Sequence, residues 1–170
     1  KYADQVKVNW TFEDASDIGA GLAVYKNSVI TSNTAGDIFA LDLKTGKKLW
    51  AYRTGGKVYS TPAVWKGIVV AGSSDHAIYA VDAGNGKLLW KVETEKAVLG
   101  SPLLHDGVAF IGSSDGKFRA LDIKTGAVKW SFDQVKGFVS TLPTYYLGNV
   151  IFGSWSNGFY ALDAKTGKLS

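Results

Sequence analysis

The stretch that decides the fold is AVDAGNGKLLW at residues 80–90, because it occurs four times along the chain. The other copies are ALDLKTGKKLW at 40–50, ALDIKTGAVKW at 120–130 and ALDAKTGKLS at 161–170. The aspartates of the four copies are Asp42, Asp82, Asp122 and Asp163, which are 40, 40 and 41 residues apart. A fixed period of this length indicates a repeat architecture in which each repeat is one supersecondary unit.

Each period divides into short apolar runs that are separated by Gly, Asn, Ser and Asp. In the second period these runs predict strands over 58–65, 68–72, 76–82 and 87–92. The third period follows the same plan, with runs at 98–104, 108–111 and 118–122. Four antiparallel strands in each period predict an all-β fold made of β-propeller blades. We expect one domain over 1–170, with repeats at approximately 10–49, 50–89, 90–129 and 130–170.

The repeats also align outside the motif. Pro62, Pro102 and Pro143 each precede their aspartate by 20 residues, so the extra residue of the fourth repeat falls before Pro143. This predicts a local bulge in an inner strand over 139–142. At the other end of the chain, Trp10 lies 12 residues before Leu22, as Trp50 lies before Pro62. We therefore expect the chain to begin with an outer strand around Trp10.

Composition excludes several classes of chemistry. The 170 residues include no Cys, so a disulfide, a thiol nucleophile and a Cys-ligated metal are excluded. The net charge of +4 comes from lysines that are spread over the repeats, so we expect no nucleic-acid partner. The sequence contains no transmembrane run and no signal peptide. Because it lacks Met even at residue 1, we expect the chain to have been processed or cut from something longer.

The order of residue types within the motif has a physical reason. An aspartate at the end of the third strand can accept N–H bonds from the tight turn that follows. The glycine of that turn supplies left-handed backbone geometry. The tryptophan comes four residues later on the outer strand, where its flat ring can lie between neighbouring blades above a small alanine. The motif aspartates are therefore predicted to cap turns.

This unit resembles the tryptophan-docking motif of the PQQ-type (quinoprotein-type) β-propeller family, and the resemblance covers essentially the whole chain. In that family each tryptophan packs between the alanine of its own motif and the glycine region of the adjacent motif. The resemblance implies docking roles for Trp10, Trp50, Trp90, Trp130, Ala40, Ala80, Ala120, Gly46, Gly86 and Gly126. The motif that would precede Trp10 is not in the chain.

The number of repeats raises the question of how the propeller closes. The family usually forms rings of seven or eight blades, so we expect the four repeats to be part of a larger ring. They would be either a piece of a longer protein or a half that pairs with another copy in a homodimer. The alternative is a four-bladed ring that the strand around Trp10 closes. An open half ring would expose two apolar blade faces.

Departures from the repeat supply the candidate partner-binding residues. These are Trp65, Trp155, Tyr145, Tyr146 and Arg119. Loop aromatics on a rigid propeller can anchor a protein or a peptide, and local packing is the alternative interpretation. Arg119 stands where the other repeats carry an aromatic residue, so it forms either a ligand contact or an internal ion pair.

No constellation of catalytic, cofactor-binding or metal-ligating residues emerges from the sequence. His76 and His105 have no counterparts in the other repeats and are predicted to lie in exposed loops. Members of the family include quinone- and calcium-dependent alcohol dehydrogenases, BamB-type assembly scaffolds and sensor domains. The resemblance therefore implies a non-catalytic scaffold for a protein partner, without a cofactor and in the periplasm or outside the cell. Two alternatives stay open: a fragment of a PQQ/calcium-dependent dehydrogenase or other larger enzyme, and an extracytoplasmic ligand-sensing domain.

Overall fold

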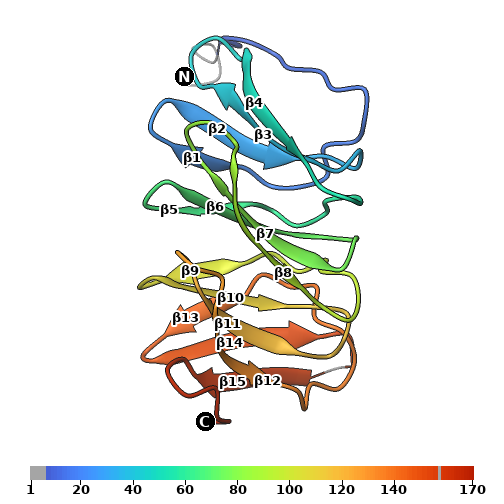
Figure 1. The fold of residues 1–170 in the computed structure, drawn as a ribbon, viewed down its shortest axis with the longest axis vertical. Coiled ribbons are helices and arrows are strands. Elements are labelled where there is room, and N and C mark those ends of the chain that lie inside the picture. Colours follow the sequence, from blue (N-terminus) through green and yellow to red (C-terminus); the bar gives the residue numbers. More distant parts are fainter. Residues whose placement is uncertain (1–6, 157) are drawn as a thin grey trace, which may run out of the picture.

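The computed structural model describes residues 7–156 and 158–170, and these residues form strands and loops without a helix. The strands make four antiparallel sheets, which we call blades 1 to 4 in chain order (Figure 1). Blade 1 contains β1 (Ala23–Tyr25), β2 (Ser28–Ser32), β3 (Asp37–Asp42) and β4 (Lys48–Arg53). Blade 2 contains β5 (Ala63–Trp65), β6 (Ile68–Ser73), β7 (Ala77–Asp82) and β8 (Leu88–Glu93). Blade 3 contains β9 (Leu103–His105), β10 (Val108–Gly112), β11 (Phe118–Asp122) and β12 (Val128–Phe132). Blade 4 contains β13 (Thr144–Tyr146), β14 (Asn149–Ser154) and β15 (Gly158–Asp163). The predicted all-β architecture of repeated blades is confirmed.

Within each blade the strands follow one another as a meander, so every strand pairs with its neighbour in the sequence. The third strand is buried in blades 1 to 3, as the run Ile38 to Leu41 shows in blade 1, whereas β15 of blade 4 is only partly buried. Between Ala40 and Leu41 the register with β4 shifts, and the same shift recurs in blades 2 and 3. This bulge increases the local twist just before the turn of the motif.

The core lies between the blades, which stack face to face. Ile30, Ile38 and Ala40 of blade 1 pack against Val69 and Tyr79 of blade 2 in one buried cluster. Two similar clusters join blade 2 to blade 3 and blade 3 to blade 4. Burial on both faces explains why the third strands of blades 1 and 2 have a continuous apolar run rather than an alternating one.

The four blades form an open stack. Blade 1 and blade 4 lie at opposite ends of the molecule in Figure 1, so the blades do not close a four-bladed ring on themselves. The short first strands lie side by side along one margin of the stack, because β1 contacts β5, β5 contacts β9 and β9 contacts β13. The blades are thus arranged as in part of a propeller, and the four-bladed ring that was the alternative is not formed.

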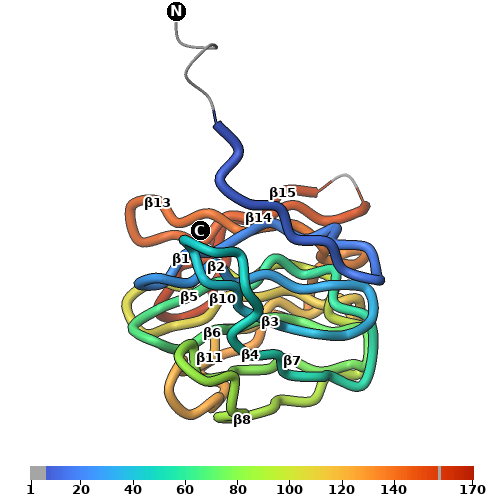
Figure 2. Tube along the Cα trace, turned by 90° about the horizontal axis from the view of Figure 1, so that it is seen from above, coloured from blue at the N-terminus to red at the C-terminus, as the bar shows by residue number. Residues whose placement is uncertain are grey.

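The segment 7–22 differs from the expected outer strand. No strand is assigned in these residues, because no neighbouring strand pairs with them in the described part of the chain. The segment instead crosses the near end of the molecule in Figure 2, where it covers blade 1. The ring of Phe12 lies 5.6 Å from that of Phe39, and Phe39 and Leu41 are buried. The expectation of two exposed apolar faces is therefore wrong, because blade 1 is covered by its own chain.

The innermost strands are shorter than predicted. The runs at 58–65 and 98–104 were expected to be strands, but β5 and β9 begin only after Pro62 and Pro102. Proline cannot donate to a ladder, and Val58 before it is buried between blades, where its N–H donates to the carbonyl of Asn33 at 3.3 Å. The extra residue before Pro143 likewise lies in a loop and not in a strand bulge.

Candidate functional site

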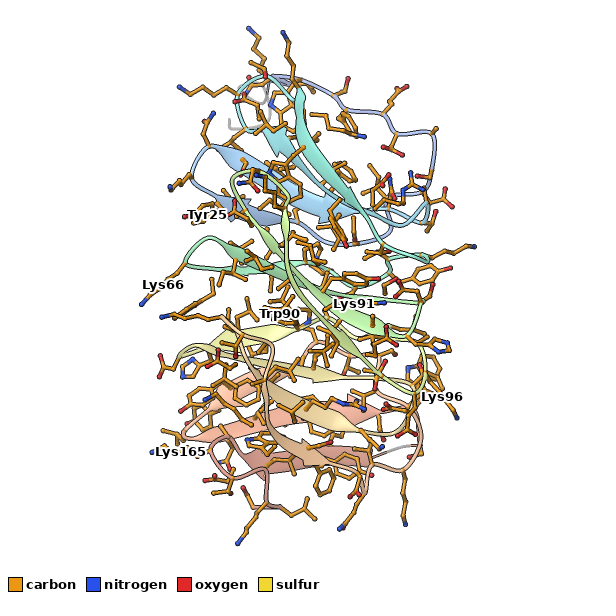
Figure 3. The ribbon with its side chains drawn as sticks, in the orientation of Figure 1. Tyr25, Lys66, Trp90, Lys91, Lys96 and Lys165 are labelled. Carbon is orange, nitrogen blue, oxygen red and sulfur yellow. The ribbon has the colours of Figure 1, made fainter. Side chains whose placement is uncertain are left out.

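The indoles of the repeated tryptophans fasten neighbouring blades. Each Nε1–H donates at 2.8–3.0 Å to a carbonyl of the following blade: Trp10 to Leu43, Trp50 to Ala83, Trp90 to Ile123 and Trp130 to Ala164. Each ring also covers a motif glycine, where a Cβ would come within 2.6–2.8 Å of a ring carbon: Gly46, Gly86, Gly126 and Gly167. Figure 3 shows Trp90 at the boundary between blades 2 and 3. Only glycine leaves room for the indole in this position.

The motif alanines form the other side of these contacts. Ala40, Ala80 and Ala120 stand directly opposite their tryptophans in the register of the third and fourth strands. All three are fully buried. A larger side chain on this strand would occupy space between the blades, so the small residue fits the geometry that the resemblance implies.

The repeated aspartates act on the backbone of their own turns. Asp42 Oδ1 accepts bonds from the N–H of Lys44 at 3.0 Å and of Thr45 at 2.8 Å, and from the Thr45 hydroxyl at 2.9 Å. Equivalent bonds occur at Asp82, Asp122 and Asp163. The bonds from Thr45 hold the pKa of Asp42 below its usual value. The predicted role of these residues as turn caps is confirmed.

Trp65 and Tyr145 lie at blade junctions rather than on an open surface. Trp65 ends β5 as predicted, and its ring lies 3.6 Å from the place that a Cβ on Gly107 of the next blade would occupy. Tyr145 stacks on His105 with ring centroids 3.7 Å apart. His105 therefore lies in β9 and packs against the ring of Tyr145 in β13, which corrects the expectation that it lies in an exposed loop. Tyr146 is exposed at the end of β13.

Arg119 belongs to an internal ion pair. Its Nη2 lies 2.5 Å from Asp115 Oδ2 and its Nη1 donates to Ser113 Oγ at 2.8 Å, while the side chain is almost fully buried. Burial by itself would raise the pKa of Asp115, but the bonds from Arg119 and Ser113 outweigh it and lower that pKa. Blade 2 builds the corresponding site with a tyrosine in place of the arginine, because Tyr79 donates to Asp75 at 2.5 Å.

Trp155 forms an exposed aromatic pair with Phe138. The two rings stack at 5.4 Å with 13° between their planes, and the indole Nε1–H donates to Ser140 Oγ at 2.6 Å. Trp155 remains 69% exposed and Phe138 38% exposed. Sequence reasoning singled out Trp155 but missed Phe138, because a single phenylalanine in a loop has no pattern around it. Comparison with Lys57 and Ala97, which hold its place in the other repeats, would have found it.

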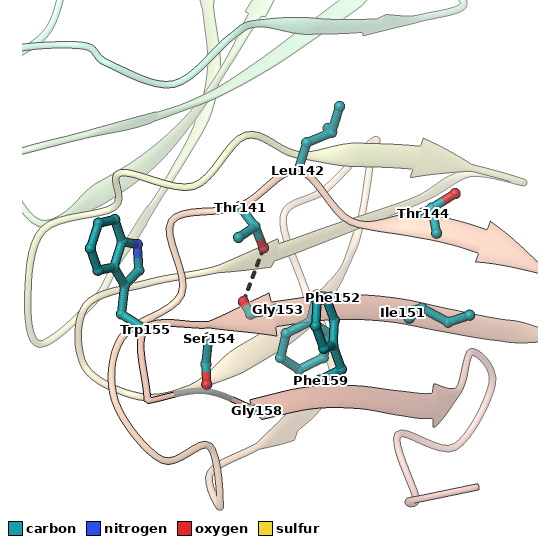
Figure 4. A pocket seen from close by; sticks show the side chains of 10 residues that line it. All are labelled: Thr141, Leu142, Thr144, Ile151, Phe152, Gly153, Ser154, Trp155, Gly158 and Phe159. Atoms are coloured by element: carbon teal, nitrogen blue, oxygen red, sulfur yellow. Dashed lines mark hydrogen bonds between the residues drawn. The ribbon is translucent and has the colours of Figure 1, made fainter.

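The end of the stack at blade 4 is hollowed by a cavity of about 610 Å³, shown in Figure 4. Its lining includes Leu142, Ile151, Gly153, Trp155 and Phe159. Phe159 is 88% exposed, although the residues in its place in the other blades are almost completely buried: Ile38, Ile78 and Phe118. An apolar face that is covered in every other blade is therefore open here.

Among the residues that the structure describes, no group of three or more His, Asp or Glu side chains lies close enough to hold a metal ion. His76 is exposed, as predicted, in the turn after Asp75. No helix in the described ranges has the length and apolar character that crossing a membrane requires.

Comparisons with solved structures agree with this geometry. BamB from Moraxella catarrhalis superposes with a TM-score of 0.78 at 23% identity, over 95% of this chain and 53% of that one. The computationally designed Ika4 protein gives 0.79 at 24% identity, over 89% of this chain and 93% of that one. A quinohemoprotein alcohol dehydrogenase from Pseudomonas putida HK5 gives 0.80 at 20% identity, over 95% and 34%. At these identities the likeness shows the fold alone.

The sequence comparisons are more specific. No curated protein matches the chain. The family described as outer membrane protein assembly factor BamB matches residues 3–95 and 66–170, which together span nearly the whole sequence. The chain spans about half the length of the solved BamB. This PQQ-like propeller chain therefore belongs to the family described as outer membrane protein assembly factor BamB.

Proposed function

We propose that this chain is a non-catalytic propeller scaffold of the cell envelope that binds a protein partner through Phe138 and Trp155. Its family supports the scaffold role and the compartment, because that family is described as an outer membrane protein assembly factor. The proposed partner is a protein of the same envelope, which presents an apolar or aromatic segment to the stacked rings.

The observation that carries the proposal is that the aromatic pair is not needed by the fold. Trp155 occupies the place of Ser74 and Ser114 in blades 2 and 3. The bond from Trp155 N to the carbonyl of Phe138, at 3.1 Å, has a counterpart from Ser74 N to the carbonyl of Lys57. The same loop geometry is thus built elsewhere from small or polar side chains, so two large apolar rings here are available for another role.

The pair also has the properties of a binding hot spot. The hydrogen bond to Ser140 and the stacking on Phe138 hold the indole in one orientation before any partner arrives. A pre-ordered side chain loses little conformational entropy on binding. Covering an aromatic ring of this size contributes about 2 kcal/mol or more to binding.

We propose in addition that the scaffold acts as a pair of chains. The open apolar face of blade 4, around Phe159, supports this, because the corresponding faces of blades 1 to 3 are all covered by a neighbouring blade.

Photo-crosslinking tests the role of the aromatic pair. A benzoylphenylalanine is placed at position 155 in one variant and at the matched position 74 in another. Both are irradiated with a detergent-solubilised outer-membrane fraction of a bacterium that has an outer membrane. We expect one crosslinked protein from position 155 and none from position 74, because only the former adjoins Phe138.

Competition provides the control. Excess unmodified chain should abolish the product, whereas the double variant Trp155→Ser, Phe138→Ala should not. Both changes introduce residues that the other blades carry in these places, so the blade should still fold. Equal products from the two positions, or equal competition by the double variant, would show that the aromatic pair is not the binding site.

A further inference from the structure

Blade 4 has an unpaired outer edge. In blade 1 the third strand pairs with β4 from Asp37 to Leu41. In the described residues, the corresponding edge of β15 is paired only at its C-terminal end. There Asp163 N donates to the carbonyl of Lys168, Leu162 bridges to Leu169 and Ser170 N donates to the carbonyl of Ala161. The edge from Gly158 to Tyr160 therefore offers backbone donors and acceptors to a further strand.

The segment 7–13 is the complement of that edge. Its side chains already lie as those of an outer strand do, because Trp10 docks on Gly46 and the rings of Phe12 and Phe39 are 5.6 Å apart. The corresponding pair Tyr52 and Tyr79 is 5.7 Å apart. In the part of the chain that the structure describes, however, residues 7–13 make no backbone hydrogen bond to another segment. The segment is thus placed as a fourth strand that lacks its sheet.

The linker after this segment matches the cavity on blade 4. The place of Ile18 is taken in the later linkers by Val58, Val98 and Val139, which are at most 1% exposed, whereas Ile18 is 38% exposed. Val98 and Val139 fill the space above glycines of the preceding blades, where an added Cβ would lie 2.3–2.4 Å from them: Gly72 and Gly112. Gly153 holds this place in blade 4 and lines the cavity, and the atom nearest to an added Cβ is Phe159 Cε1 at 3.4 Å rather than a side chain of a linker.

A backbone bond repeats the same pattern. Val58 N donates to the carbonyl of Asn33 at 3.3 Å, and Val98 N donates to that of Ser73 at 3.0 Å. The carbonyl of Ser154 holds the corresponding place in blade 4. Residue Ile18 thus has an N–H suited to that carbonyl and a side chain suited to the space above Gly153.

We infer that two copies of this chain exchange these parts and close one ring. Residues 10–13 of each copy become the fourth strand of the other copy's blade 4, with Trp10 opposite Ala161 and Glu13 opposite Gly158. Ile18 of each copy fills the cavity above Gly153 of the other, and Phe159 becomes covered as Phe118 is. The register follows from the pairs Ala40 with Trp50 and Asp37 with Arg53.

A second copy is the occupant that accounts for both ends of the molecule. The prepared strand lies at blade 1 and the unpaired edge at blade 4, and these ends are on opposite sides of the stack (Figure 1), so the two do not contact each other in the described residues. A two-fold pair brings each end against its complement and creates two identical junctions, which leaves no face open. This inference rests on the paired scaffold proposed above, and it adds the contacts through which the pair forms.

Disulfide trapping tests the register, because the chain contains no cysteine of its own. The double variant Glu13→Cys, Gly158→Cys is oxidised and run on a non-reducing gel, with each single variant as a control. Other blades carry Asp37 and Ala77 in the place of Gly158. An added Cβ at Gly158 would lie 3.1 Å from Tyr160 Cε2, so the single variant Gly158→Cys also reports whether the blade accepts this side chain. We expect a covalent dimer from the double variant and none from either single one. A covalent ladder of larger species, or only monomer, would overturn the strand exchange.

Sedimentation equilibrium tests the covered face. Phe159→Asp should raise the dimer dissociation constant by about 100-fold, because a charge would enter an apolar junction. Leu147→Asp is the matched control: Leu147 is 78% exposed and its place in blade 3 is held by Asp106, so the dimer should persist. Dimerisation that Phe159→Asp leaves unchanged would keep the proposed pairing but contradict this junction. A wild-type chain that stays monomeric would contradict the pairing itself. Crosslinking at position 155 reports separately on the protein partner.

Discussion

At the scale of single residues, the motif glycines and the indoles above them leave no spare volume. Gly126 has φ +75, and a Cβ there would lie 2.8 Å from Trp90 Cδ2. Two different costs meet at this one position, because the left-handed backbone disfavours any side chain and the indole blocks the space that it would need. Gly148 allows the two costs to be measured separately, because it has the left-handed backbone without a neighbouring indole.

Gly126→Ala should lower the free energy of unfolding by about 2–5 kcal/mol, from left-handed strain together with overpacking. Gly148 has φ +83 but nothing within 4 Å of an added Cβ. Gly148→Ala should therefore cost only about 1–2 kcal/mol, from strain alone. Urea unfolding at a fixed protein concentration measures both values, and equal losses would show that the indole does not confine Gly126.

The buried pair of Asp115 and Arg119 makes stability depend on pH. The pKa of Asp115 is lowered in the fold, so its contribution is complete above the ordinary carboxyl pKa and is lost as the pH falls through the folded value. Asp115→Asn should cost about 2–4 kcal/mol at pH 7, because it leaves Arg119 without its charged partner. It should also flatten the loss of stability between about pH 5 and pH 3.

The exposed Asp133 supplies the comparison for this experiment. Asp133→Asn should change the free energy of unfolding by less than about 0.5 kcal/mol, both at pH 7 and in the acidic range. Unfolding curves for both variants across this pH range decide the matter. A wild-type pH dependence that survives in Asp115→Asn would assign the acid sensitivity to other carboxylates.

At the scale of elements, the motif predicted the third strands, the turns and the outer strands well. Asp82 acts on its own turn, so the local sequence predicts its effect. Gly86 and Trp90 make their contacts with neighbouring blades, and they could be recognised because the motif recurs. The first strands were predicted to be too long. Val58 is a β-branched residue that favours a strand, but its side chain is buried between two blades in the linker before the strand. The bulge after Ala80 also has no local signal, since it depends on how two strands pair.

The indole on the outer strand fastens that strand to the next blade. Trp90→Phe removes the Nε1–H bond to the carbonyl of Ile123, which the native structure makes at 2.8 Å in a buried site. An unsatisfied carbonyl together with a smaller ring should cost about 2–4 kcal/mol. Trp155→Phe, on an exposed ring, should cost less than about 0.5 kcal/mol. Urea midpoints at one protein concentration compare them, and equal shifts would refute the fastening role of Trp90.

At the scale of the whole molecule, the two ends of the stack are unlike. The sequence predicted an open half ring but not that residues 7–22 cover blade 1, because Phe12 and Ile18 match the repeat only when they are placed in the preceding blade. It identified Trp155 by its rarity, whereas Phe138 and Phe159 stand out only once their exposure is known. A candidate site that is defined by the exposure of apolar residues, because no neighbouring blade covers them, can be found only in the three-dimensional structure.

The central claim is that blade 4 gains its fourth strand from a second copy of the chain. Amide hydrogen exchange at Phe159 and Ala161, whose N–H groups face the outer edge, tests it most directly, at two protein concentrations on either side of the dimer dissociation constant. Strand pairing predicts that these two edge-facing amides are protected at high concentration and lose this protection on dilution, with the amides of β7 unchanged. Exchange at this edge that is fast and independent of concentration would contradict the account.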